Sequence, residues 1–169
     1  MPAEPVARGR PAMTNDTITR DFTATTFIVR DGRTLLLWHK KMQAWLPPGG
    51  HLHPNELPEL AAVREVAEET GLEVEILGRR QKWGQVQVLR RPTCILLEDI
   101  SEGHQHIDLI YFAGVIGGAK ETVNALEAAG SRWCDWDDLG SVEIPEDIRR
   151  LGRQAIRQVM EDQQARRRP

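Results

Sequence analysis

Three glutamates, Glu65, Glu68 and Glu69, stand at positions i, i+3 and i+4 of a segment with helical character. At about 100° per residue, these spacings place the three carboxylates on one helix face, close to the C-terminal end. Like charges at this spacing repel one another, and the negative end of the helix dipole adds to the penalty. Hard divalent cations such as Mg²⁺ and Mn²⁺ prefer carboxylate oxygens and keep positions open for phosphate and water. The trio is therefore a candidate cation site, and a solvated acidic helix face is the alternative.

Arg64 lies directly before the trio, one helical turn ahead of Glu68 and two turns after Glu56. A guanidinium can donate hydrogen bonds to carboxylates on either side of it. We therefore predict that Arg64 braces the glutamates as a supporting residue of the site. Surface ion pairs along a charged helix are the alternative.

The segment that carries these residues has the start and stop signals of a helix. Asn55 is a candidate N-cap, Pro58 is tolerated in the first turn, and no further breaker occurs through Glu69. Gly71 is well placed as the residue just after the helix. The glutamates are thus expected on the last turns of one helix.

Further elements are indicated on both sides of this helix. A hairpin around Asp31-Gly32 is predicted for residues 23–29 and 33–39. A tight loop that ends in extended chain is predicted for the Pro- and Gly-rich residues 46–52. Strands are expected over 73–77, 85–89, 94–97, 107–116 and 131–136. The strands over 94–97 and 107–116 are expected to form a second hairpin, and a terminal helix is expected over 145–164. This mixture predicts an α/β domain without internal repeats.

The composition restricts the class of protein. The chain has 169 residues, 40% of them hydrophobic, which suits one domain that buries a core without disulfides. Residues 21–144 hold 12 basic and 19 acidic side chains, which argues against nonspecific nucleic-acid binding. The longest apolar stretch has 11 residues, whereas a membrane span needs about 20, so no membrane crossing is expected. Cys94 and Cys134 lack C-x-x-C spacing and favour a reducing, cytoplasmic location.

The two ends of the chain are expected to lie outside the domain. Residues 1–18 are predicted to be a disordered tail, with Met13 as a candidate native start. Residues 19–164 are expected to form the domain, and residues 165–169 a basic tail. The sequence indicates no oligomeric state.

A 23-residue pattern joins these features. Residues 50–72 match G-x5-E-x7-R-E-U-x-E-E-x-G-U at every fixed position, with the aliphatic U positions occupied by Val66 and Leu72. The pattern resembles the Nudix box, and weaker similarity extends from about Phe22 to Met160. The resemblance implies an α/β/α sandwich with a mixed sheet, in which the box forms a loop–helix–loop beside the active site.

The same resemblance assigns roles to box residues. It implies that the three helix glutamates are metal ligands, that the carbonyl oxygen of Gly49 completes the coordination, and that Arg64 and Glu56 orient the ligands. The implied cofactor is Mg²⁺ or Mn²⁺, which neutralises phosphate oxygens and activates water. The implied reaction is hydrolysis of a diphosphate bond in a small-molecule nucleotide.

A further acidic residue precedes the last strand in many members of the family that this box resembles. Glu127 falls at the corresponding place, so the resemblance implies that it is a metal ligand or a general base. Glu102, Glu121 and Asp108 are its rivals, and a solvent-facing glutamate is the alternative.

Histidine and lysine residues outside the box offer weaker signals. One face of a predicted strand carries His104, His106 and Asp108, which alternate along the chain. The favoured interpretation is that they form a polar rim of the substrate cleft, and the alternative is a separate metal site. Lys40 and Lys41 are candidates for phosphate contact, with an ordinary surface pair as the alternative.

Base recognition is the least constrained part of the prediction. In purine-specific relatives an acidic or amide side chain before the last helix bonds the base edge, and Asp147 or Glu146 occupies that region. The helix dipole alone would also favour acidic residues there. Trp45 and Trp83 are candidates for stacking on a base, whereas Trp38, Trp133 and Trp136 are expected to pack in the core.

The first expectation for the substrate is an oxidised or modified purine nucleoside triphosphate, cleaved to monophosphate and pyrophosphate. Nucleotide sugars, ADP-ribose and dinucleoside polyphosphates are the alternatives within the same reaction class. A non-enzymatic nucleotide-sensing module is disfavoured, because such a domain is expected to have lost carboxylates from the box.

Overall fold

The computed structural model describes residues 18–141 and 143–167. Its elements are β1 (Thr19–Arg30), β2 (Arg33–His39), β3 (Ala44–Leu46), β4 (Gly49–His51), α1 (Pro58–Thr70), β5 (Val74–Ile76), β6 (Gln81–Trp83), β7 (Val86–Val88), β8 (Cys94–Ser101), β9 (His104–Val115), β10 (Ala128–Cys134), a 3₁₀ turn η1 (Asp138–Gly140) and α2 (Glu146–Arg167). The predicted tail over 1–18 and the candidate start at Met13 lie almost wholly outside the described residues.

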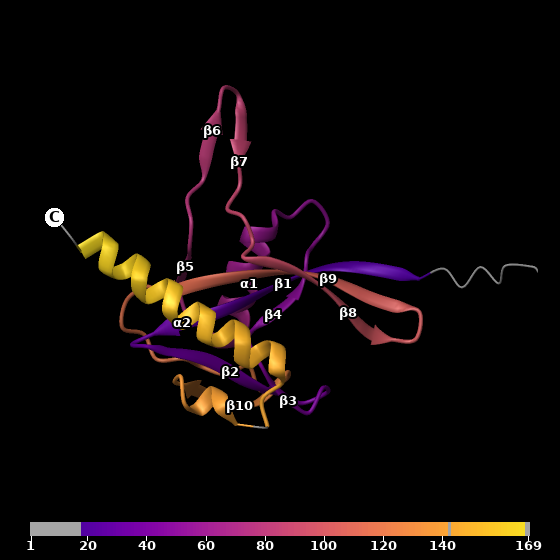
Figure 1. The fold of residues 1–169 in the computed structure, drawn as a ribbon. Helices are drawn as coiled ribbons and strands as arrows, with labels where there is room; N and C mark the ends of the chain where they lie inside the picture. Colours follow the sequence, from indigo (N-terminus) through magenta and orange to yellow (C-terminus); the bar gives the residue numbers. More distant parts are fainter. Residues whose placement is uncertain (1–17, 142, 168–169) are drawn as a thin grey trace, which may run out of the picture.

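A mixed sheet forms the centre of the molecule (Figure 1). Its path runs β10-β2-β1-β9-β5, with β3 paired to β2, β4 to β1 and β8 to β9. The long strands β1 and β9 are parallel from Thr19↔His104 to Val29↔Gly114, and the other pairings in this sheet are antiparallel. Each β1 residue therefore has a fixed neighbour on β9, which the site uses below.

The two faces of the sheet carry separate apolar cores, because alternate residues of a strand point to opposite sides. On one face Ile28 packs with Ala62 and Val66 of α1. On the other face Phe27 packs with Ile156 of α2. One helix on each face makes the predicted α/β/α sandwich, and the predicted fold class is confirmed.

The hairpin at the start of the sheet opens into a gap. Asp31 and Gly32, both at positive φ, form its two-residue turn, and β1 and β2 pair directly only beside that turn. Farther along, β4 takes the edge of β1, from Thr23↔His51 to Thr25↔Gly49, and β3 takes the edge of β2. The predicted tight loop over 46–52 thus contains β4 and begins at the last residue of β3, and these two three-residue strands separate the arms of the hairpin.

Helix α1 ends as predicted and begins differently. Gly71 has φ of 65°, and its N–H donates to the carbonyl oxygen of Ala67, as expected for a left-handed cap. The N-cap residue is Leu57, whose side chain makes no capping bond, so the prediction of Asn55 as N-cap is wrong. Asn55 instead adopts φ of 65° in the preceding turn, a conformation that asparagine tolerates well.

Other elements also differ from the predictions: β8 ends four residues later than expected, and β9 and β10 each begin three residues earlier. Residues 81–83 form β6, which pairs with β7 in a small second sheet that projects from the body (Figure 1). Helix α2 continues through Arg167, so residues 165–167 of the predicted basic tail are helical, and their place outside the domain stays a prediction. Among the described residues, no helix is long and apolar enough to cross a membrane.

Shortening the chain after Gln164 should leave turnover unchanged and cost about 1 kcal/mol or less of stability. The deletion removes Arg166, whose guanidinium contacts Glu75 at 2.6 Å and Asp162 at 2.7 Å. These side chains are substantially exposed, and exposed pairs contribute little. Urea unfolding and steady-state kinetics check the expectation, with Arg166→Ala in the full chain as the matched control. A loss of turnover in the shortened chain alone would contradict it.

Candidate active site

Arg64 is the hub of the carboxylate site. Its guanidinium binds Glu56 through two parallel hydrogen bonds, Nε to Oε1 at 2.8 Å and Nη2 to Oε2 at 2.9 Å. The remaining donors reach Glu65 Oε1 at 2.7 Å, Glu68 Oε2 at 3.1 Å and the carbonyl oxygen of His51 at 3.0 Å. The predicted contacts of Arg64 with Glu56 and Glu68 are present, and the contacts with Glu65 and His51 add to them.

The pairing with Arg64 lowers the pKa of Glu56. Two charge-assisted hydrogen bonds from one guanidinium stabilise the carboxylate, and they lower the pKa of Glu56 to about 2. Glu56 also accepts a hydrogen bond from the backbone N–H of His53 at 2.9 Å. Glu56 therefore stays ionised and ties the loop before α1 to the helix.

Glu69 occupies a different environment from the other two glutamates of the trio. It is 6% exposed, whereas the side chain of Glu68 is 55% exposed. Burial, followed by hydrogen bonding to Glu127 and the charge of that residue, raises the pKa of Glu69 to about 8. Glu127, directly before β10, thus lies beside Glu69 of the trio, and its role as a metal ligand or general base stays a prediction.

The donor set suits a divalent cation. The neighbouring carboxyl groups of Glu69 and Glu127 offer the oxygens that Mg²⁺ and Mn²⁺ prefer, once Glu69 has released its proton. A Cβ at Gly50 would lie 2.5 Å from Glu65 Oε1, so only glycine lets this carboxylate approach the loop so closely. Assignment of Gly49, Glu65, Glu68, Glu69 and Glu127 as the ligands stays a prediction.

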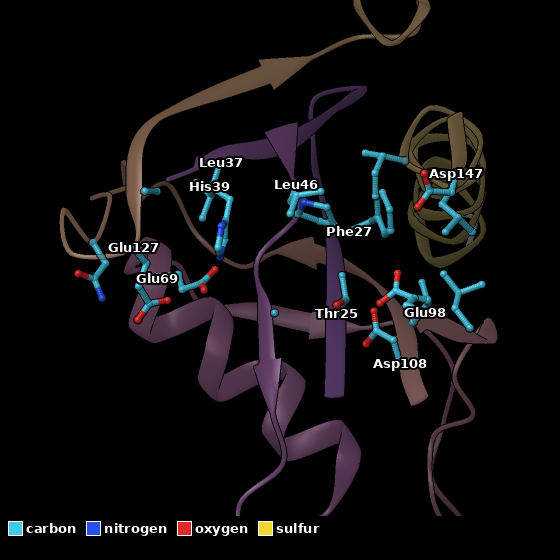
Figure 2. A pocket seen from close by; sticks show the side chains of 18 residues that line it. Thr25, Phe27, Leu37, His39, Leu46, Glu69, Glu98, Asp108, Glu127 and Asp147 are labelled. Atoms are coloured by element: carbon cyan, nitrogen blue, oxygen red, sulfur yellow. The ribbon is translucent and has the colours of Figure 1, made fainter. Parts of the chain in front are cut away.

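Next to these carboxylates lies a pocket of about 160 Å³, in the gap between the diverging strands (Figure 2). Glu69 and Glu127 point toward one another at one end of the pocket, and Glu98, Asp108 and Asp147 gather at the other. The residues that line it are Thr25, Phe27, Leu37, His39, Leu46, Pro47, Gly49, Glu69, Leu96, Glu98, Asp108, Ile110, Asn124, Glu127, Ala128, Asp147, Ile148 and Leu151. The pocket is apolar in the middle and acidic at both ends.

Two of the acidic groups at the far end, Glu98 and Asp108, have raised pKa values. Burial, followed by the charges of Asp108 and Asp147, raises the pKa of Glu98 to about 7. Burial also raises the pKa of Asp108, which accepts a hydrogen bond of 3.0 Å from the hydroxyl of Thr23. Near neutral pH this end can therefore both donate and accept hydrogen bonds.

His39 adds a donor between the two acidic ends. Its Nδ1 accepts a hydrogen bond of 3.1 Å from the backbone N–H of Met42, so in the neutral imidazole the proton is on Nε2. Figure 2 shows the ring directed into the pocket beside Glu69. Neither His39 nor Glu98 was among the sequence candidates, because only the strand pairing reveals which side chains face the gap.

Several sequence candidates lie elsewhere. Lys40 and Lys41 are exposed and do not line the pocket, and Lys40 Nζ bonds the carbonyl oxygen of Ala125. Among the rivals of Glu127, Glu121 pairs with Arg30 at 3.0 Å, and Glu102 lies exposed in the turn between β8 and β9. Phosphate contact by either lysine stays a prediction that the geometry does not support.

The tryptophans do not line the pocket either. Trp83 is 68% exposed on the β6–β7 hairpin, and Trp45 packs edge-on against Trp38 with ring centroids 5.4 Å apart. Trp136 is 49% exposed under the guanidinium of Arg153, so its predicted core position is wrong. The aromatic side chain that does line the pocket is Phe27.

Comparison with known proteins agrees with the geometry. The family model of the NUDIX domain matches residues 20–158. A Bacillus subtilis protein named "Putative 8-oxo-dGTP diphosphatase" is 30% identical over 117 residues, which are 69% of this chain and 67% of that protein. An RNA pyrophosphohydrolase of Saccharophagus degradans is 38% identical over 80 residues, and the match spans 40% of this chain and 47% of that relative.

Solved structures show the same fold. A NUDIX-family hydrolase from Clostridium perfringens aligns with a TM-score of 0.73 at 32% identity, over 83% of this chain and 99% of that one. The chain belongs to the Nudix hydrolase family. The predicted enzyme class, a pyrophosphohydrolase acting on phosphoric anhydrides, is confirmed. Nudix hydrolases use divalent metal ions and act on nucleotides.

Proposed function

We propose that this chain uses Mg²⁺ or Mn²⁺ to hydrolyse the diphosphate bond of nucleoside diphosphate-linked compounds, and that its first substrates are nucleoside triphosphates of oxidised or modified purines. The products are a nucleoside monophosphate and pyrophosphate. The observation that carries the proposal is a single pocket with Glu69 and Glu127 at one end and hydrogen-bonding carboxyl groups at the other. Glu69 belongs to the same helix as Glu65 and Glu68, the two glutamates of the trio that Arg64 holds. The free thiols of Cys94 and Cys134 support action in a reducing cytoplasm.

The metal-binding end would handle the phosphates. Glu65, Glu68, Glu69 and Glu127, with the carbonyl oxygen of Gly49, would hold the cations. When bound, the cations supply charge neutralisation on the phosphate oxygens and an activated water. Arg64 keeps three carboxylates in fixed positions through its fork of donors. The Nε2–H of His39 offers a hydrogen bond to a phosphate oxygen that enters beside Glu69.

The opposite end would recognise the base. Phe27 and Ile148 provide apolar contact for a planar ring, and Glu98 and Asp147 border the same space. A carboxyl group that keeps its proton near neutral pH donates a hydrogen bond, while an ionised neighbour accepts one. Such a donor–acceptor pair suits the edge of a modified purine, which presents both kinds of group.

Other substrates of the same reaction class are alternatives. Nucleotide sugars, ADP-ribose and dinucleoside polyphosphates share the diphosphate bond and differ in the attached group. The relative named RNA pyrophosphohydrolase adds the 5′ end of RNA to this set. The acidic central segment weighs against a long nucleic-acid contact, because such contacts need basic side chains along the phosphates.

A substrate panel tests the proposal. Phosphate and pyrophosphate release should be measured for modified and unmodified purine triphosphates, pyrimidine triphosphates, ADP-ribose, a nucleotide sugar, a dinucleoside polyphosphate and triphosphorylated RNA, in Mg²⁺ and in Mn²⁺. We expect the highest kcat/KM and stoichiometric pyrophosphate release with a modified purine triphosphate. A higher kcat/KM for any of the other classes would replace the proposed substrate, and absence of turnover on the whole panel would contradict the proposed activity.

Asp147→Ala should raise KM for the preferred purine nucleotide by roughly 5- to 150-fold. Asp147 is exposed in the structure, and a hydrogen bond that the bound base shields from water is typically worth about 1–3 kcal/mol. Hydrolysis of a nucleotide that shares only the phosphates should change little, since the metal ligands are untouched. Steady-state kinetics on two purine and two pyrimidine triphosphates measure the difference.

Glu146→Ala is the matched control for this change. Glu146 lies in the same first turn of α2 and interacts equally with the helix dipole, but it does not line the pocket. The control should leave the ratio of purine to pyrimidine KM unchanged. An equal effect of Asp147→Ala on all four nucleotides would assign Asp147 to the helix end rather than to the base.

A further inference from the structure

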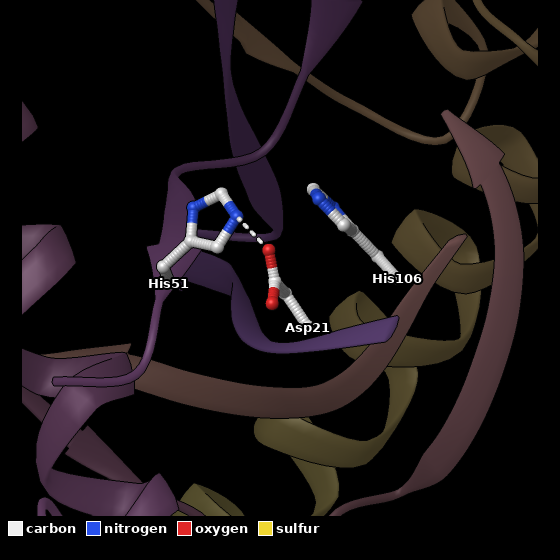
Figure 3. Close-up of side chains that lie close together, drawn as sticks. All are labelled: Asp21, His51 and His106. Carbon is white, nitrogen blue, oxygen red and sulfur yellow. Dashed lines mark ion pairs between the residues drawn. The ribbon is translucent and has the colours of Figure 1, made fainter. Parts of the chain in front are cut away.

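Four side chains from three strands converge beside the pocket without lining it. Asp21 comes from β1, His51 from β4, and His104 and His106 from β9. One ligand atom each of Asp21, His51 and His106 lies within 4.8 Å of the others, and Figure 3 shows the three side chains directed toward one another. The fourth, His104, approaches the same carboxylate oxygen of Asp21, at 3.6 Å from its Nε2.

The distances leave room for a cation. Asp21 Oδ2 lies 3.7 Å from His51 Nε2 and 3.6 Å from His104 Nε2, and both separations exceed the roughly 3.2 Å limit of a good N–H···O bond. Ligands bonded at about 2.0–2.2 Å to a tetrahedral ion stand about 3.3–3.5 Å apart. These two separations therefore fit ligands around an ion better than they fit direct hydrogen bonds. The ligand atom of His106, which belongs to the group within 4.8 Å, would move closer on binding.

One tautomer of His104 leaves Nε2 free for a cation. The hydroxyl of Thr19 lies 3.2 Å from the carbonyl oxygen of Gly103, to which it can donate, and 2.9 Å from His104 Nδ1. In the tautomer that carries its proton on Nδ1, this hydroxyl accepts a hydrogen bond from Nδ1–H. The lone pair of neutral His104 is then on Nε2, directed at the Asp21 carboxylate. Two acceptors that face one another call for a cation between them, and an outer hydrogen bond of this kind is typical of metal-binding histidines.

The three imidazoles also lie close together. The rings of His51 and His106 lie 4.8 Å apart and those of His104 and His106 lie 5.2 Å apart, both edge to face. Neutral imidazole is the form that binds metal.

We propose that Asp21, His51 and His106, with His104 as fourth ligand, form a second divalent-cation site, with Zn²⁺ as its expected ion. Three imidazole nitrogens with one carboxylate oxygen are ligands that Zn²⁺ accepts readily, whereas Mg²⁺ prefers oxygen. The glutamate set of the active site offers oxygen alone. The proposal is separate from the proposed hydrolysis and does not depend on its substrate.

The position of this site links it to the active site. Asp21 and His106 are register partners on the parallel strands, and Thr23 pairs with Asp108 two residues farther along. His51 follows Gly50 of the box loop, and its carbonyl oxygen accepts a hydrogen bond from Arg64 Nη2 at 3.0 Å. A bound ion would join β4 to β1 and β9 and so hold the start of the box in place.

Titration of the full-length chain with Co²⁺, a visible stand-in for Zn²⁺, tests the proposal. The chain is first stripped with EDTA and then kept in excess Mg²⁺ to occupy the glutamate site. We expect one equivalent of Co²⁺ to give the visible absorption of a tetrahedral site, and Zn²⁺ to displace it. In parallel, Zn²⁺ should raise the Tm by about 3 °C or more, because binding to the folded state alone stabilises it.

Matched variants identify the ligands. His106→Gln and His51→Gln should abolish the absorption and the Tm shift, whereas His53→Gln, an exposed histidine outside the cluster, and Glu69→Gln should keep both. If a histidine variant fails to fold, Asp21→Asn replaces it as the test, because the side chain of Asp21 is 55% exposed. Asp21→Asn should likewise abolish the absorption and the Tm shift. Absence of the absorption in the unaltered chain, its retention in the histidine and Asp21 variants, or its loss in Glu69→Gln would overturn the proposal.

Discussion

Glu69→Gln is expected to lower turnover at least about tenfold under saturating Mg²⁺, and by more than Glu68→Gln. Both changes remove one ligand charge from the proposed cation site. Glu69 is 6% exposed and lies against Glu127, so no water can take over its role easily. The carboxylate of Glu68 is 55% exposed and is held by Arg64 alone. Steady-state kinetics with the preferred nucleotide measure both effects.

The same substitution should stabilise the metal-free protein. Glu69 has a folded-state pKa of about 8 against an ordinary value of 4.5. For an acid whose pKa rises on folding, stability is lost as pH increases from the ordinary value to the folded one, because only the unfolded state has released its proton. The stability gained by Glu69→Gln should therefore grow between about pH 4.5 and 8 and stay level above that. Thermal unfolding in EDTA at several pH values shows this dependence.

Glu73→Gln provides the control for both measurements. Glu73 is an exposed glutamate just after the helix and does not line the pocket. The control should leave turnover and the pH dependence of the Tm as they are in the unaltered chain. Near-normal turnover of both Glu68→Gln and Glu69→Gln in saturating metal would remove these residues from the proposed metal site.

The sequence was sufficient to predict the helix face that carries the three glutamates and two of the contacts of Arg64. The spacing of Glu65, Glu68 and Glu69 depends only on helix geometry, which local sequence determines. The bracing position of Arg64 follows from the same periodicity, and the structure shows its contacts with Glu56 and Glu68. These residues are separated by few positions in the chain, so no long-range information was needed.

The far end of the pocket depends on contacts between distant segments. Glu98 lies at this end because β8 pairs with β9 in the register Glu98↔His106. Phe27 lines the pocket because β1 diverges from β2 after the hairpin turn. A local sequence pattern determines neither the register of a strand pairing nor the point at which two strands diverge. The convergence of Asp21 with His51 and His106 likewise requires both β4 and β9 to pair with β1.

Arg64→Ala should damage the site more than the distance of Arg64 from the pocket suggests. The substitution frees Glu56, Glu65 and Glu68 together, and removal of one partner from a mostly buried ion pair typically costs about 3–5 kcal/mol. We expect weaker Mn²⁺ binding and turnover at least about tenfold lower, because a supporting residue typically contributes 10- to 100-fold. Titration with Mn²⁺ and steady-state kinetics measure the two effects.

Arg64→Lys separates geometry from charge in this result. Lysine keeps the positive charge but cannot span both oxygens of Glu56 with two parallel bonds, so it should restore stability in part and metal affinity hardly at all. In the unaltered chain Glu56 has a pKa of about 2, below its ordinary 4.5, so this carboxylate contributes stability that is complete above about pH 4.5 and is lost as pH falls toward 2. The stability gap between the unaltered chain and Arg64→Ala should therefore narrow over that range. Unchanged Mn²⁺ affinity in Arg64→Ala would show that the fork of hydrogen bonds does not position the ligands.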